Sequence, residues 1–258
     1  MTHADLPSRI REAIKEPHGK VNHLNTARIP LCLPPEARTP LLYTLGLLRY
    51  AEIYLGLEKV WLAEIGDPIH WIQGTSDNMD PNTSGRERIQ TVLRLLYLPE
   101  LLRTKRFEAD FLALQSLDPN ISSLGAGKVT AGSQFRQYIE EDLPTKPHLL
   151  VAYIWIMYQA LFNGGRFIRM QLLKAGPEFW GLSARSMNTA ALPVPLSFWH
   201  VDEEEVIKAS FRSRLNMADK LLTETEREEI IQEAVEILRR CELITLQLDA
   251  DVHVEMLA

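Results

Sequence analysis

Apolar residues recur along most of this chain at steps of three and four, which is the spacing of a helix face. The first such segment, residues 6–24, has four residues on one face: Ile10, Ile14, His18 and Val21. A histidine therefore shares an apolar stripe. Pro17 lacks a backbone N–H, so the helix is expected to kink or restart there.

The same spacing predicts further helices at 41–65, 87–117, 133–142, 147–174, 202–219 and 226–248, with a break at Pro99. Thr223 and Glu226 have the spacing of a capping box at the start of the last helix. Strand-like alternation is weak everywhere. We therefore expect an all-α fold of seven to nine helices, forming a single domain over residues 1–258 with a core at about 6–248.

Composition narrows the class of protein. The chain has 28 Lys and Arg against 34 Asp and Glu, a net charge of −6, which argues against nucleic acid as a partner. Its two cysteines, Cys32 and Cys241, are too few for a disulfide framework and favour a reducing, cytoplasmic location. The longest apolar stretch, Leu149–Phe162, is too short to span a membrane, and no segment resembles a signal peptide.

Common cofactor and nucleophile motifs are missing, which leaves a few unusual residues. Gly164 and Gly165 lie inside a predicted helix, at a cost of about 1 kcal/mol each, and allow either a flat ligand or a second helix to approach. Lys208 and Arg212 stand one helical turn apart and form either a clamp for carboxylates or a solvated face. His18 is either a core histidine or a ligand. Together, these features match an iron porphyrin with two propionates.

Four blocks of sequence occur in the order found in one known family. Residues 10–18 (IREAIKEPH) resemble the proximal helix of haem oxygenases, in which an R/K-E-A-x-K-E-x-H run ends in the iron-ligating histidine. Residues 97–101 (YLPEL), followed by Arg103, are similar to the Y-x-P-E segment of that family. Residues 149–165 align with its distal helix, and residues 208–216 (KASFRSRLN) resemble its propionate-binding K-x-x-x-R-S-R-x-N motif.

The resemblance implies a function and a set of site residues. Haem is both substrate and cofactor in this family, and it is opened to biliverdin, carbon monoxide and iron with electrons from an NADPH-dependent reductase or another donor. His18 would be the metal ligand. The other implied haem-binding residues are Arg11, Tyr158, Lys208 and Arg212, and the implied catalytic residues on the distal side are Asn163, Gly164 and Gly165.

One departure from the family pattern keeps other functions open. Leu161 stands where well-studied members carry a distal aspartate, although the A-L-F-x-G-G form of this segment is similar to the fungal, yeast-like branch. Asn163 is the nearest polar side chain that could order a distal water. The alternatives are a non-catalytic haem-binding or haem-sensing protein, and a haem oxygenase fold reused for another apolar molecule in fungal metabolism.

Overall fold

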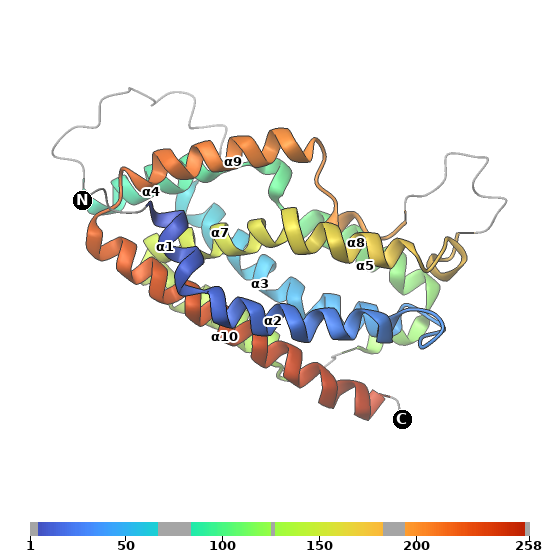
Figure 1. The fold of residues 1–258 in the computed structure, drawn as a ribbon. Coiled ribbons are helices and arrows are strands. Elements are labelled where there is room, and N and C mark those ends of the chain that lie inside the picture. Colours follow the sequence, from blue (N-terminus) through green and yellow to red (C-terminus); the bar gives the residue numbers. More distant parts are fainter. Residues whose placement is uncertain (1–4, 67–83, 125–126, 183–193, 256–258) are drawn as a thin grey trace.

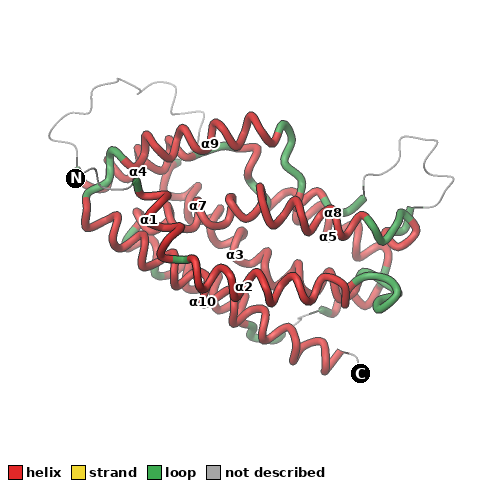
Figure 2. The backbone as a smooth tube through the Cα atoms, in the orientation of Figure 1, coloured by secondary structure: helices red, strands yellow, loops and turns green. Residues whose placement is uncertain are grey.

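The computed structural model describes residues 5–66, 84–124, 127–182 and 194–255, and these residues form only helices and loops (Figure 2). The all-α fold class is therefore confirmed. Within those ranges there are ten α-helical segments, slightly more than expected, because two predicted helices are each divided. None of the described helices is both long enough and apolar enough to cross a bilayer.

The first predicted helix is divided into α1 (Leu6–Ala13) and α2 (Lys15–Arg28). The break falls at Ile14, whose φ and ψ of −90° and −1° depart from helical values, and not at Pro17. Pro17 instead lies in the first turn of α2, where a missing N–H breaks no helical hydrogen bond. The helix also continues past residue 24 to Arg28, whose guanidinium binds the Asp249 carboxylate of α10 through two contacts of 2.7 and 2.5 Å.

The 25-residue helix α3 (Leu41–Ile65) runs through the core and packs against α4 (Gly85–Leu96), α5 (Thr104–Leu117) and α6 (Ala131–Glu141). The predicted break at Pro99 is confirmed as a 3-10 turn, Pro99–Leu101. Gly132 lets α6 approach α3 closely, since a Cβ there would lie 2.6 Å from the Arg49 carbonyl oxygen. The two backbones therefore pack without an intervening side chain.

The predicted helix at 147–174 is a continuous run with a change of helical type in its middle. It consists of α7 (Leu150–Ala160), a π-helical turn (Leu161–Gly165) and α8 (Arg166–Leu173). Such turns are rare in helices and frequently occur at functional sites. The glycine pair is thus inside a helix, as predicted, and it coincides with the π turn.

Two long helices complete the bundle (Figure 1). The helix α9 (Glu204–Asp219) packs on α4, and α10 (Glu224–Glu255) packs along α2, α1 and α7. The predicted capping box is confirmed: the Thr223 N–H donates to the Glu226 carboxylate at 2.8 Å, and the Glu226 N–H donates to the Thr223 hydroxyl at 3.3 Å. The helix α10 continues beyond the predicted end at Leu248, and part of this extension packs beside α2.

Candidate functional site

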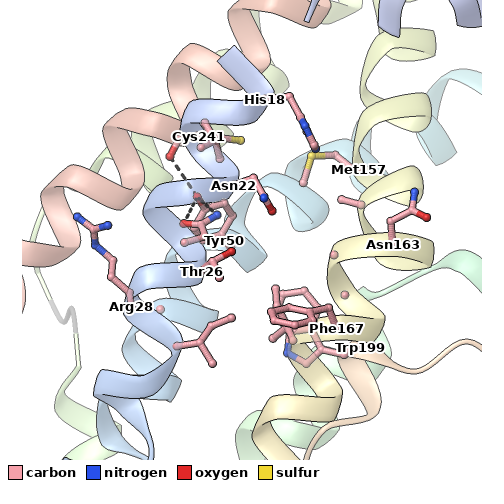
Figure 3. A pocket seen from close by; sticks show the side chains of 18 of the residues that line it. His18, Asn22, Thr26, Arg28, Tyr50, Met157, Asn163, Phe167, Trp199 and Cys241 are labelled. Carbon is pink, nitrogen blue, oxygen red and sulfur yellow. Dashed lines mark hydrogen bonds between the residues drawn. The ribbon is translucent and has the colours of Figure 1, made fainter. Parts of the chain in front are cut away.

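A cavity of about 1080 Å³ lies between α2 on one side and α7, the π turn and α8 on the other (Figure 3). Side chains of α3 and α10 close its back. Most of the lining is aliphatic or aromatic, with a few polar groups. A volume of this size is at the upper end of the range for small-molecule sites.

The α2 wall carries a row of polar side chains. His18, Asn22 and Thr26 are spaced by four residues, so they share one helix face, and all three are exposed and line the cavity. Among the described residues, no hydrogen bond or ion pair involves the His18 ring. The imidazole nitrogens are therefore available to a ligand.

The opposite wall is thinnest at the glycine pair. A Cβ on Gly164 would meet no atom within 4 Å, so this glycine borders open space. The adjacent Asn163 side chain also lines the cavity, and its amide donates to the Gln159 carbonyl at 3.3 Å. Figure 3 shows the His18 ring pointing across the cavity toward Met157, one helical turn before Ala160. The predicted proximal and distal helices therefore face each other.

Gly165 has a different environment from Gly164. It is buried, and a Cβ there would lie 3.2 Å from Cε3 of the Trp199 indole. Trp199 itself lines the cavity, and its indole N–H donates to the Tyr43 hydroxyl at 3.0 Å. Gly165 therefore makes room for an aromatic wall of the cavity, which is a packing role.

The two ends of the cavity differ in charge. Arg11 and Lys15 line it beside the start of α2. The end beyond α2 is formed by the 3-10 turn Ile29–Cys32 and α8, which contact each other, and it is mostly apolar, because Arg28 there is ion-paired with Asp249. Its apolar lining residues are Ile29, Leu31, Cys32, Phe167, Ile168 and Leu172. A ligand with a charged end and an apolar end would therefore have one preferred orientation.

Three of the residues expected at the site, Lys208, Arg212 and Tyr158, do not line the cavity. Arg212 is exposed on α9, and Lys208 is half-buried on the same helix. Arg214, from the same motif, donates to the carbonyls of Leu95 and Tyr97 at 3.1 and 3.0 Å, so it fixes α9 to the end of α4. That part of the motif is structural.

Tyr158 is fully buried beside a buried carboxylate, not in the cavity wall, which corrects the expectation of direct ligand contact. Its hydroxyl donates to Glu58 Oε1 at 3.2 Å. Glu58 also accepts from the Arg103 N–H at 2.5 Å and from the N–H and hydroxyl of Thr104 at 2.9 and 2.6 Å. Burial raises the pKa of Glu58, and these hydrogen bonds oppose that rise.

Two side chains that follow the block around Pro99, Arg103 and Asp110, position the cavity wall indirectly. The buried Arg103 guanidinium donates to the carbonyls of Phe198 and His200 at 3.1 and 2.6 Å. The Asp110 carboxylate accepts from the Phe198 N–H at 2.7 Å and from the Ser197 hydroxyl at 2.7 Å. Together they hold the turn that carries Trp199 into the cavity.

The polar row of α2 is backed by a hydrogen-bonded cluster that joins α2, α3 and α10. The Tyr50 hydroxyl lies 2.6 Å from the Thr245 hydroxyl and 3.0 Å from the Asn25 amide nitrogen, and Thr245 donates to Asn25 Oδ1 at 2.8 Å (Figure 3 shows part of this cluster). With the Arg28–Asp249 pair, this cluster fixes the rotation of α2. It therefore directs His18 into the cavity.

Sequence reasoning did not single out Met157, Tyr43, Tyr54 or Trp199 as lining residues. Met157 lies seven residues before Gly164, the spacing of one helix face, so its position was predictable in principle. Trp199 comes from a turn that is distant in sequence from every other cavity element. No local signal marks it.

Comparison with known proteins agrees with this geometry. Residues 82–240 match the family model described as "Heme oxygenase". A curated relative, the "Heme-binding protein HMX1" of Saccharomyces cerevisiae, is 23% identical over 242 residues, which cover 89% of this chain and 70% of the relative. The yeast relative gives limited support to the expected fungal branch.

Solved haem oxygenases have the same fold. A cyanobacterial heme oxygenase-1 from Synechocystis, in complex with heme, matches with a TM-score of 0.68 at 17% identity, covering 98% of this chain and 96% of that one. Heme oxygenase 2 from Chlamydomonas reinhardtii, without heme, gives 0.67 at 15% identity, covering 94% and 96%. The heme oxygenase of Leptospira interrogans gives 0.63 at 19% identity, covering 94% and 98%. Because the family model matches well over half of the chain, the chain belongs to the heme oxygenase family.

Proposed function

We propose that this chain binds haem in the cavity, with His18 as the proximal iron ligand, and opens the ring to biliverdin, carbon monoxide and iron. One observation carries the proposal: an exposed imidazole, which has no partner among the residues that the structure describes, points into a largely apolar cavity opposite a helix wall thinned by Gly164. Imidazole is a common axial ligand of haem iron, and an apolar slot suits the flat face of a porphyrin.

The residues present fit the group in charge as well as shape. Arg11 and Lys15 lie at one end of the cavity and are suited to bind the two propionates, while the apolar end accepts the rest of the ring edge. Lys208 and Arg212, which do not line the cavity, are proposed to add only a longer-range attraction. The cations would thereby set the orientation of the ring between the helices.

The two cysteines of the cavity are poor competitors for the iron. Burial raises the pKa of the Cys32 thiol to about 11 and that of the Cys241 thiol to about 12. Both therefore stay protonated at neutral pH, and the thiolate is the form that binds metals. This leaves His18 as the better iron ligand of the cavity wall.

Bound haem would supply the iron that binds dioxygen, and electrons would come from an external, NADPH-dependent reductase or another donor in the cytosol. The chain's own contribution is positional. Gly164 leaves space for a small diatomic gas, and the Asn163 amide is proposed to order a distal water. Leu161 is buried and does not line the cavity, so it contributes no proton-carrying group.

Because Leu161 carries no group that could deliver protons, a second candidate function is favoured, a non-catalytic haem-binding or haem-sensing protein of the fungal, yeast-like branch. The cavity would then hold haem without an efficient route for protons to the distal side. The third possibility, a fold reused for an unrelated apolar molecule, would be supported by a His18 ring that points away from the pocket. The direction of His18 argues against it.

A haem titration tests the proposal. On adding haem, wild-type protein should develop a Soret band, and the His18→Ala variant should lose it. His23 is an exposed histidine of α2 outside the cavity lining, so the His23→Ala variant should match wild type. Adding a reductant and oxygen should then yield biliverdin. Intact haem after that treatment would favour the sensing role, and a His18-independent spectrum would refute the site.

A further inference from the structure

The exposed surface of α8 carries an unusual number of large apolar side chains. Phe167, Met170 and Leu173 are 41%, 50% and 40% exposed, and they follow one another at steps of three residues. Leu31, which is 55% exposed, comes from the 3-10 turn that contacts α8. Because residues three and four apart share a helix face, these side chains form one outward apolar stripe.

Cations accompany this stripe. Arg166 and Lys174 are exposed on the same side of the helix, and Arg169 lies at its edge. Arg166 makes a long ion pair of 3.9 Å with Glu204 and borders Glu203 and Glu205 at its own end of the helix, whereas Lys174 contacts the neutral amide of Gln171. No acidic residue occurs between positions 160 and 176, in a chain whose net charge is −6. The α8 face, meaning Arg166, Phe167, Met170, Leu173 and Lys174, is therefore locally basic as well as apolar.

We propose that the α8 face is a docking surface for an anionic lipid bilayer. Apolar side chains interleaved with Lys and Arg are what an interfacial helix presents to a membrane, since the apolar groups enter the acyl boundary while the cations remain at the charged headgroups. In a symmetric dimer through this face, like charges would meet.

The α8 face lies beside an opening of the cavity, so docking would bring that opening to the bilayer. Phe167 and Leu31 belong both to the exposed apolar surface and to the lining of the cavity, so the cavity opens at the edge of the α8 face. In Figure 1, α8 lies at the end of the bundle away from the N-terminus, beside the end of α2. A docked molecule would take an apolar ligand from the lipid phase. Lipid binding itself is independent of the proposed function, whereas haem uptake from the bilayer rests on it.

Vesicle co-sedimentation of the full chain tests the docking. Wild-type protein should bind phosphatidylcholine vesicles that contain phosphatidylserine, should bind plain phosphatidylcholine vesicles far less, and should be released by high salt. Met170→Glu/Leu173→Glu changes two residues outside the cavity lining and should weaken binding by at least about tenfold. Leu243→Glu/Leu246→Glu is a matched control on α10, where the leucines are 59% and 45% exposed, and should bind like wild type.

Three outcomes would overturn the docking surface. They are no binding of wild type to anionic vesicles, equal binding of the α8 variant, and a dimer in gel filtration that only the α8 variant breaks. A His18-dependent haem spectrum in the α8 variant shows that it is folded. If vesicles bind but haem dissolved in them is not taken up, uptake from the bilayer is refuted and the docking surface stands, while the haem titration in solution decides the proposed function separately.

Discussion

Gly165 lies directly against the indole ring of Trp199: a Cβ at this position would be 3.2 Å from the ring carbon Cε3. Its neighbour Gly164 faces open space, with no atom within 4 Å of the corresponding point. Two adjacent glycines therefore serve different purposes. One allows an aromatic wall to close, and the other keeps the cavity wall thin beside the expected iron site.

This difference predicts opposite effects on stability. Gly164→Ala should raise the free energy of unfolding by up to about 1 kcal/mol, because alanine favours helix and its methyl group meets no atom. Gly165→Ala has the same intrinsic gain but must displace Trp199, and should be at least about 1 kcal/mol less stable than Gly164→Ala. Urea unfolding of the two variants provides the comparison. A more stable Gly165→Ala would show that the indole moves freely.

Tyr158 offers a direct test of its corrected role. Tyr158→Phe removes one hydrogen bond to the buried Glu58 carboxylate and should lower the free energy of unfolding by about 1 to 2 kcal/mol. Haem affinity should not change, because Tyr158 does not line the cavity. The control is Tyr54→Phe, which removes a buried hydroxyl bonded to the Met157 carbonyl at 2.9 Å in the cavity wall. Weaker haem binding by Tyr158→Phe alone would restore the original assignment.

The cations near the site should differ in their effect on affinity. Arg11→Gln/Lys15→Gln should weaken haem binding by about tenfold or more, since charge-assisted bonds to the propionates contribute about 1.5 kcal/mol or more each. Lys208→Gln/Arg212→Gln should have a smaller effect, because neither side chain lines the cavity. Equilibrium haem titrations of both double variants, at low and at high salt, measure the two effects on affinity. The reverse order would mean that α9 moves toward the ligand on binding.

The parts of the site that the sequence predicted are those carried by helical periodicity. Periodicity placed His18 and the glycine pair inside helices, and it is retained through the kink at Ile14 and the π turn, whereas the resemblance to haem oxygenases implied that these two helices face each other. The exact break was not predictable from Pro17, since a proline is harmless in the first turn of a helix.

The rest depended on contacts between distant segments. Lys208 and Arg212 have the right spacing for a clamp, but spacing fixes only their relation to each other, and the packing of α9 on α4 decides which way that helix faces. Trp199 enters the cavity because Arg103 and Asp110, about 90 residues earlier, hold its turn. Tyr158 shares the distal helix with the glycine pair, yet its face turns toward Glu58.

The start of α10 predicts a specific dependence of stability on pH. Burial of the Glu226 carboxylate raises its pKa, but two hydrogen bonds from Arg88, of 2.7 and 2.9 Å, and the Thr223 N–H outweigh this and hold the pKa at about 2. The folded-state pKa is thus below the ordinary value of 4.5. The resulting stabilisation is complete above that value and is lost as the pH falls from 4.5 toward 2.

Glu226→Gln should therefore cost about 2 kcal/mol of unfolding free energy near neutral pH, since solvent screens part of the pair, and much less at about pH 3. Glu228→Gln, at an exposed position two residues further along α10, serves as the matched control and should leave the pH profile unchanged. Urea unfolding of the three proteins from about pH 7 to pH 3 measures the difference at each pH. If the difference in unfolding free energy between wild type and Glu226→Gln stayed constant over this range, Glu226 would act only as a neutral helix cap. Its negative charge would then add nothing to the interaction with Arg88.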